Sequence, residues 1–130
     1  MRELKFRAWY KPGKKMIYNI QNEFEERIEL SMDCFSDYLK NDVFIVNQFT
    51  GRTDKEGKET YEDDILLIIG QGYFRVTWDR DSCKFYLLPL EDYLDKMPLD
   101  RSWEIDYEVE GNIHENKDLL EYIEKDQKTK

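Results

Sequence analysis

Short segments with the character of β-strands recur along this chain about every ten residues, a spacing typical of small sandwiches and barrels. They are rich in β-branched and aromatic residues, which pack well on a pleated surface. Gly, Asp or Pro closely follows each segment and can turn the chain. The clearest examples are residues 43–49, 65–69, 73–78 and 83–88. We therefore predict a mainly β protein with a small barrel or sandwich.

The N-terminal residues predict a β-hairpin. Residues 4–10 alternate, with Leu4, Phe6, Ala8 and Tyr10 on one face and Lys5, Arg7 and Trp9 on the other. Pro12 and Gly13 then predict a turn, because proline presets φ and glycine accepts a positive φ. Residues 16–20 return as the second strand. We expect the Lys5, Arg7 and Trp9 face to point outward.

A second alternating segment, residues 103–109, predicts a strand with a strongly acidic outer face. Trp103, Ile105, Tyr107 and Val109 would face the core, whereas Glu104, Asp106, Glu108 and Glu110 would face outward. Carboxylates at this period lie roughly 7 Å apart and repel one another. A basic neighbour is therefore expected, and the first strand offers one.

Two arrangements would bring these opposite charges together. In one, the first strand and the acidic strand are neighbours within a single chain, where opposite charges pair across strands. In the other, the basic strand of one copy meets the acidic strand of a second copy and forms a homo-oligomer. On either arrangement, the candidate binding residues are Lys5, Arg7, Trp9, Glu104, Asp106 and Glu108.

The remaining segments predict a few short helices. Residues 35–40 and 92–97 suit short helical turns, and Asn116 can cap a final helix that docks through Leu119, Leu120 and Ile123. Residues 28–32 alternate as a strand would. We expect one domain over residues 1–124, with N-terminal strands in 1–49, the barrel core and final helix in 50–124, and a disordered tail over 125–130.

Composition limits the class of protein. A length of 130 residues suits one domain, and 15% aromatic residues indicate a packed core. No apolar run approaches the roughly 20 residues that span a bilayer, and the N-terminus lacks the apolar core of a signal peptide. The two cysteines, Cys34 and Cys83, are expected to be free thiols. We therefore expect a cytoplasmic protein without a membrane partner.

Charge argues against general nucleic-acid binding. The net charge is −9, which repels phosphate backbones. The distribution is uneven, since residues 1–15 contain six Lys or Arg and one Glu. The Lys5, Arg7 and Trp9 face alone combines basic and aromatic side chains, as a nucleic-acid surface requires.

Catalytic motifs are weak. Residues 61–64 (YEDD) could hold Mg²⁺ for phosphodiester cleavage, because hard cations prefer carboxylate oxygens. We favour instead a solvated turn that enters a strand. His114, the single histidine, suits a packed turn residue better than a general base. We expect no catalytic residue, metal or cofactor.

Three groups of segments, taken in series, are typical of one family. The first comprises residues 5–9 (KFRAW) and 14–18 (KKMIY), the second 48–51 (QFTG), 54–59 (DKEGKE) and 61–65 (YEDDI), and the third 108–116 (EVEGNIHEN). Together they resemble the YopX family of small phage and prophage proteins. The resemblance implies a small SH3-type barrel with an N-terminal β-hairpin and one or two short helices, a phage origin and no catalytic residues. The chain departs from the family at Asp63, where Gly is typical, and at Lys117, where Pro is frequent.

The expected function is a non-catalytic protein-binding or assembly module acting in the cytoplasm of a bacterial host. Its partner would be a protein, with a second copy of this chain as one candidate. Two alternatives stay open: nucleic-acid binding through the basic N-terminal hairpin, and an acidic inhibitor that mimics DNA to occupy a host enzyme. A metal-dependent nuclease is a further, weaker alternative.

Overall fold

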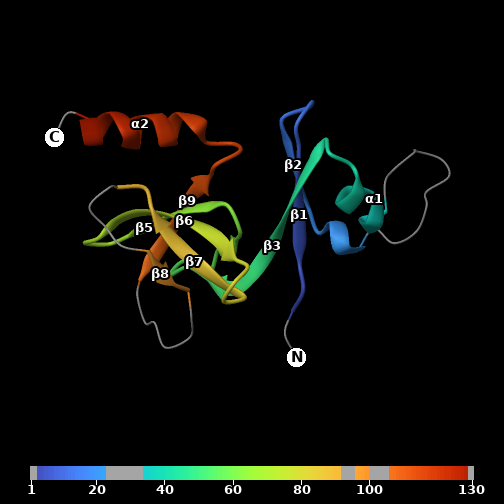
Figure 1. Cartoon of the computed structure of the whole chain (residues 1–130), viewed down its shortest axis with the longest axis horizontal. Helices are drawn as coiled ribbons and strands as arrows, with labels where there is room; N and C mark the ends of the chain where they lie inside the picture. Colours follow the sequence, from blue (N-terminus) through green and yellow to red (C-terminus); the bar gives the residue numbers. More distant parts are fainter. Residues whose placement is uncertain (1–2, 23–33, 92–95, 100–105, 129–130) are drawn as a thin grey trace.

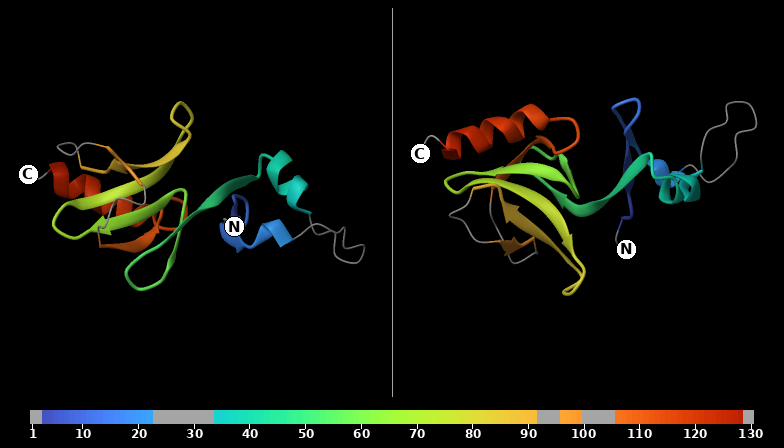
Figure 2. Two further views of the ribbon diagram at one scale, coloured as in Figure 1. Left: turned by 90° about the horizontal axis from the view of Figure 1, so that it is seen from below. Right: turned by 45° about the horizontal axis from the view of Figure 1, so that its top comes forward.

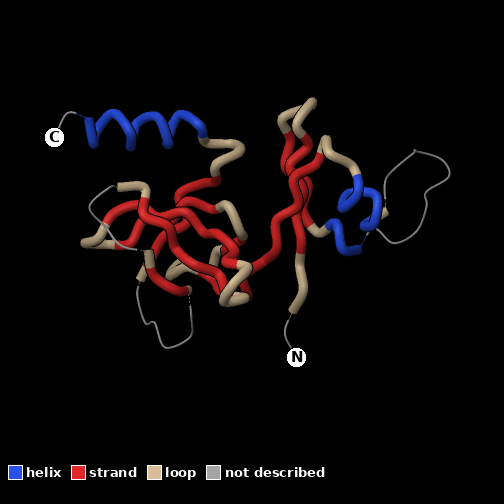
Figure 3. Tube along the Cα trace, in the orientation of Figure 1, coloured by secondary structure: helices blue, strands red, loops and turns tan. Residues whose placement is uncertain are grey.

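The computed structural model describes residues 3–22, 34–91, 96–99 and 106–128, and it is mainly β (Figures 1 and 3). In chain order its elements are β1 (Phe6–Tyr10), β2 (Lys15–Tyr18), the 3-10 turn η1 (Ile20–Asn22), α1 (Phe35–Lys40), β3 (Phe44–Thr53), β4 (Glu59–Tyr61), β5 (Asp64–Ile68), β6 (Gly72–Asp79), β7 (Lys84–Pro89), β8 (Met97–Pro98), β9 (Tyr107–Asn112) and α2 (Lys117–Lys128). The predicted mainly β class is confirmed.

The first sheet has the strand order β2-β1-β3-β4 and is antiparallel. The predicted hairpin of β1 and β2 is confirmed, but the positive φ of its turn falls on Lys14 (φ 50°) and not on Gly13. Ala8, Ile20 and Tyr38 form a buried cluster between the hairpin, η1 and α1. This packing explains why the predicted helical turns at residues 35–40 are stable: α1 covers apolar side chains of the sheet.

The second sheet has the order β8-β7-β6-β5-β9 and is also antiparallel. It curls into a half-barrel, and α2 lies along one of its faces (Figure 2). The core contains Leu66, Ile68, Phe74, Val76 and Leu87, all fully buried. Each such side chain contributes about 1.5–3 kcal/mol on burial. A curled sheet of this kind is compatible with the SH3-type barrel that the family resemblance implies.

Strand β3 runs past the point where the sequence predicts its end, so it pairs with β1 along its first part and with β4 along its last part. Residues 44–48 pair with β1, and Phe49 and Thr53 pair with β4. The register shifts between Phe49 and Thr53, where Gly51 has a φ of 89°. Thr50 and Gly51 therefore make an irregularity within the strand rather than ending it.

Other boundaries also differ from the predictions. Met97, the last residue of the predicted helix 92–97, lies in strand β8, and residues 92–95 lie outside the described ranges. The strand predicted for residues 103–109 is described only from Tyr107, and it continues through Gly111 and Asn112. Helix α2 extends to Lys128, whereas the sequence predicted a disordered tail from residue 125. The alternation at residues 28–32 falls outside the described part.

Two further sequence expectations concern the cysteines and the membrane. Cys34 and Cys83 are both free thiols, as predicted. Within the described ranges, no helix has the length and apolar character to cross a bilayer.

Candidate functional site at the junction of the two sheets

The turn between β4 and β5 connects the two sheets through backbone hydrogen bonds of two consecutive residues. The Glu62 N–H donates to the carbonyl of Gln48 (3.0 Å) in the first sheet, and the Asp63 N–H donates to the carbonyl of Val76 (2.9 Å) in the second. The Asp63 carbonyl accepts from the Ile113 N–H at 3.1 Å. Asp63 has a φ of 71°, a conformation that glycine adopts more easily. The side chain at this position must therefore stabilise the turn by its own contacts.

Asp63 makes three such contacts. Its carboxylate accepts from the Asn47 Nδ2 at 2.9 Å and from the Arg75 guanidinium at 3.0 Å. The His114 Nε2 lies 3.0 Å from the same carboxylate, and its ring stacks on Trp9 with centroids 5.7 Å apart. These donors come from β3, β6 and the turn after β9, so one carboxylate connects both sheets and the approach to α2.

The neighbouring Asp64 forms a buried ion pair with Arg7. Both residues are 2% exposed, and the guanidinium lies 2.9 Å from the Asp64 Oδ1. The second carboxylate oxygen accepts from the Tyr61 N–H at 2.7 Å. Arg7 also donates to the Glu62 carbonyl (3.1 Å) and to Asn47 (3.3 Å). These hydrogen bonds to both members of the pair offset part of the desolvation cost of burying two charges.

The pKa values of the two aspartates shift in opposite directions. Burial raises the pKa of Asp64 to about 6, even though Arg7 and the Tyr61 amide favour its ionised form. Burial also acts to raise the pKa of Asp63, but hydrogen bonds from His114, Arg75 and Asn47 outweigh it, and the pKa of Asp63 is lowered. The difference follows from the number of side-chain donors that face each carboxylate.

This geometry bears on the hypotheses for residues 61–64. Asp63 and Asp64 direct their oxygens at protein donors, and no group of three or more His, Cys, Asp or Glu within the described ranges could hold a metal ion. The favoured interpretation, a solvated turn, is wrong, because both aspartates are buried. His114 does pack beside the start of α2, with its Nε2 engaged by Asp63.

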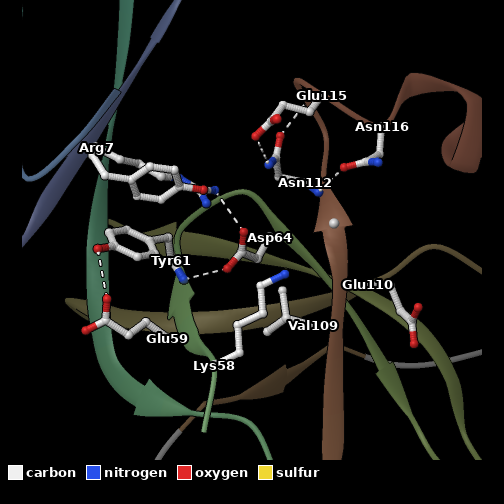
Figure 4. Close-up of a pocket in the computed structure, with 12 residues that line it drawn as sticks. Arg7, Lys58, Glu59, Tyr61, Asp64, Val109, Glu110, Asn112, Glu115 and Asn116 are labelled. Atoms are coloured by element: carbon white, nitrogen blue, oxygen red, sulfur yellow. Dashed lines mark hydrogen bonds and ion pairs between the residues drawn. The ribbon is translucent and has the colours of Figure 1, made fainter. Parts of the chain in front are cut away.

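A cleft of about 480 Å³ opens beside the Arg7–Asp64 pair, between the first sheet and β9 (Figure 4). Its apolar walls are Tyr18, Tyr61 and Val109, and the two tyrosine rings meet edge to face at 5.9 Å. Burial raises the pKa of Tyr61 to about 12, so its hydroxyl stays protonated. We name this space the acidic cleft, because the carboxylates that line it outnumber its cations.

The rim of the acidic cleft contains one ammonium and three carboxylates, from Lys58, Glu59, Glu110 and Glu115. Glu59 is already paired with Lys5, and the Glu115 Oε1 accepts from the Asn112 Nδ2 at 3.0 Å. Burial and the neighbouring carboxylate of Glu108 raise the pKa of Glu110. Glu110 therefore gains from a nearby cation, which would relieve this repulsion.

The structure separates the residues that the sequence singled out as one binding surface. Lys5 pairs with Glu59 and with Glu3 (3.3 Å), and Trp9, like Arg7, is buried. The prediction that Arg7 and Trp9 point outward is therefore wrong. Tyr61, Asp64 and His114 cover the face of Arg7 and Trp9. Because α1 and η1 cover the opposite face of β1, both faces are buried and alternation did not decide exposure.

The acidic strand has other partners. Glu108 pairs with Lys55 at 2.8 Å, Asp106 is exposed, and Glu104 lies outside the described ranges. Because β9 lies next to β5 in the second sheet, it is not a neighbour of β1, and the expected pairing of these strands within one chain is wrong. The sequence signal that would have found the junction is an arginine in mid-strand, at Arg7 and at Arg75, since a buried arginine requires a carboxylate.

These features define a small, mainly β protein in which two antiparallel sheets meet at a buried network of charges. The family model described as "YopX protein" matches residues 5–121, and the chain belongs to this family. It is similar to the crystal structure of protein EF1440 from Enterococcus faecalis, with a TM-score of 0.63 and 23% identity over 92% of this chain and 99% of that chain. At this identity the similarity shows the fold alone. The search of curated proteins found no match.

Proposed function

We propose that this protein is a non-catalytic binding module that receives a basic segment of a partner protein in the acidic cleft. The observation that carries the proposal is the charge of the cleft. Three carboxylates and one ammonium line its rim, and Lys5 pairs with only one of these carboxylates, Glu59, above a floor where Arg7 and Asp64 neutralise each other. An arginine or lysine of a partner would restore the balance. Complementary charge of this kind gives specificity and speeds association.

The walls of the cleft support the same ligand chemistry. The guanidinium of Arg7 lies over the Tyr61 ring, 4.8 Å from its centroid, so this buried ring already holds a flat cation of the chain itself. Tyr18 is half exposed and offers a second ring at the mouth. A cation over such a ring gains about 0.5–1 kcal/mol at exposed sites. Aromatic walls with a carboxylate rim therefore favour arginine over an anionic or neutral group.

The state of the ionisable residues supports a role without catalysis. Asp63, Asp64, His114 and Arg7 all make short contacts with one another or with backbone groups at the junction. A general base or nucleophile needs a side-chain atom that can contact the substrate and is not already hydrogen-bonded within the fold. We assign these residues to holding the two sheets in position, so that the cleft keeps its shape.

The setting of the protein follows from its family. As a member of the YopX family, it is proposed to be a phage or prophage protein that acts in the cytoplasm of a bacterial host. The basic segment could belong to a host protein or to a second copy of this chain, whose hairpin tip presents Lys11, Lys14 and Lys15. Light scattering separates these sources: a low-salt oligomer that Lys14→Glu dissolves identifies a second copy, and a monomer at low and high salt identifies a separate protein.

Binding to a defined probe tests the acidic cleft. The probe is a fluorescein-labelled peptide of alternating Arg and Gly, compared with the same peptide carrying neutral citrulline. We expect the arginine peptide to bind more tightly, and Glu110→Gln with Glu115→Gln to weaken it at least about fivefold, or about 1 kcal/mol. Glu56→Gln with Glu121→Gln, an equal change of charge at two exposed residues outside the cleft, is the matched control.

Two results would contradict the proposal. Equal binding of the arginine and citrulline peptides would show that charge does not select the ligand. Cleavage of plasmid DNA in Mg²⁺, lost in Asp64→Asn, would show that residues 61–64 form a nuclease site and that the module is catalytic.

A further inference from the structure

We propose that a second cleft, on the other side of Glu115, binds the phosphate of a nucleotide. This cleft has a volume of about 650 Å³ and lies between the tip of the β1–β2 hairpin and the start of α2. Its volume falls in the range of about 300–1,000 Å³ that small-molecule sites occupy. We name it the lysine cleft. It goes beyond the proposed function, because it differs from the acidic cleft in position and in charge.

Three lysines supply the positive charge. Lys11 and Lys14 come from the hairpin tip and Lys117 from the first residue of α2, so elements distant in sequence converge on one space. All three are exposed, and none makes an ion pair with any residue in the described ranges. Lys5, Lys55 and Arg75, by contrast, each pair with a carboxylate. The lysines of this cleft are therefore available to an external anion.

Two carboxylates, Glu115 and Asp118, also line the lysine cleft, so its three lysines leave an excess of one positive charge. Glu115 lines both clefts, and its Oε1 accepts from Asn112, which lines the acidic cleft (Figure 4). Charges farther than a Debye length, about 8 Å at physiological salt, are largely screened. The net charge of −9 therefore does not decide what this cleft attracts.

The rings of Trp9 and His114 form one wall of the cleft. They stack with centroids 5.7 Å apart and an interplanar angle of 22°. Asp63 holds the His114 Nε2 at 3.0 Å, which fixes the orientation of this wall. Trp9 and the His114 side chain are each only 8% exposed, so the cleft reaches the edge of this ring pair. An aromatic edge beside ammonium groups matches a base and its phosphate, because aromatic rings also pair edge to face. A nucleotide fits this combination better than inorganic phosphate does.

The conformation of Lys14 supports a role for its side chain. It has a φ of 50° in the hairpin turn, where glycine would remove the backbone strain. Strained residues concentrate at binding sites, where the side chain has a task that the backbone alone does not demand. Here the lysine places an ammonium group on the lining of the cleft.

Nuclear magnetic resonance with adenosine monophosphate as the probe tests this proposal. We expect its binding to shift the Trp9 indole resonance and the amide resonances of Lys14 and His114. Adenosine lacks the phosphate and inorganic phosphate lacks the base, so each is expected to bind at least about tenfold more weakly than adenosine monophosphate. A 5′-phosphorylated oligothymidylate distinguishes the two sources of a nucleotide phosphate: tighter binding than the mononucleotide would identify the end of a DNA strand.

Variants locate the site. Lys14→Ala should weaken adenosine monophosphate binding at least about fivefold. Lys15→Ala removes the same charge from the same hairpin outside the cleft and should leave binding unchanged, as should Glu110→Gln in the acidic cleft. An absence of shifts at Trp9 and Lys14, equal binding of adenosine, or an equal loss in Lys15→Ala would overturn the proposal. The peptide experiment above is independent of all three outcomes.

Discussion

At the scale of single residues, the Arg7–Asp64 pair shows how a charged side chain can sit in the middle of a short strand. Arg7 was expected on the solvent-exposed face of a hairpin, yet it is 2% exposed and its guanidinium lies over the Tyr61 ring. Removing one partner of a buried pair leaves the other charge without compensation, which costs about 3–5 kcal/mol. The pair is therefore a point where a single substitution should affect the whole fold.

We predict that Arg7→Met destabilises the protein in a pH-dependent way. In the wild type the folded pKa of Asp64 is about 6 and exceeds its ordinary value, so the contribution of Asp64 to stability decreases as pH rises from about 4 to about 6. Loss of the guanidinium raises this pKa further and extends to higher pH the range over which the contribution of Asp64 to stability decreases. The cost of the substitution should be small near pH 5 and reach about 3–5 kcal/mol near pH 8.

Urea unfolding of the wild type and Arg7→Met across this pH range measures the effect. Lys5→Met is the control, because Lys5 forms an ion pair with the partly exposed Glu59, and such pairs contribute about 0–1 kcal/mol. A cost for Arg7→Met that is independent of pH would show that Asp64 stays ionised without its partner.

At the scale of elements, the sequence predicted those that a local pattern of residues marks. The hairpin β1–β2, helix α1 and strands β5, β6 and β7 were found from alternation and turn residues. Ile65, Leu66 and Ile68 are all fully buried, as a short apolar run predicts. Boundaries set by distant contacts were missed: β3 passes through Gly51 because β4 pairs beyond it, and β9 passes through Gly111 because β5 pairs there.

The candidate site was predictable only in part. The YEDD segment and the Lys5, Arg7 and Trp9 face were both singled out, but nothing local in either indicates that Arg7 meets Asp64. That contact joins residues on different sheets, and its partners depend on tertiary packing. Both clefts arise in the same way, from the hairpin, the end of β9 and the start of α2.

We predict that Gly111→Ala disturbs the start of α2. A Cβ at Gly111 would collide with the Asn116 side chain, whose Oδ1 accepts from the Asn112 N–H at 3.0 Å. The substitution should cost about 1–3 kcal/mol, as overpacking does. Thermal unfolding measures it. Adding Asn116→Ser, a shorter side chain, should recover part of the loss, and no recovery would place the strain elsewhere.

At the scale of the whole molecule, the two sheets are held together by more than the charged network. The Tyr107 hydroxyl donates to the Thr53 carbonyl at 3.1 Å and lies 2.8 Å from the Thr60 hydroxyl. The Asp54 carboxylate accepts from the Val109 N–H at 3.0 Å. Because Thr53 of β3 and the adjacent Asp54 both contact β9 of the second sheet, we expect the protein to unfold as one cooperative unit.

This expectation gives a third prediction. Urea unfolding followed by tryptophan fluorescence and by circular dichroism should give coincident transitions. Tyr107→Phe should destabilise the protein by about 1–3 kcal/mol, because the buried partners of the hydroxyl lose their hydrogen bond. The two transitions should still coincide in this variant. Separate transitions in the wild type would mean that the halves unfold independently.

The consecutive amides of Glu62 and Asp63, which donate to opposite sheets, limit how the length of this chain can change. An added or deleted residue between Tyr61 and Asp64 would rotate one amide away from its acceptor and displace both carboxylates from their cations. The turns at residues 11–14 and 79–83 have no such double role. Natural variation in length, and any engineered insertion of a tag or fluorophore, should therefore be accommodated by the fold at those two turns, with the turn at residues 79–83 also leaving the lysine cleft intact, and excluded from the four residues that join the sheets.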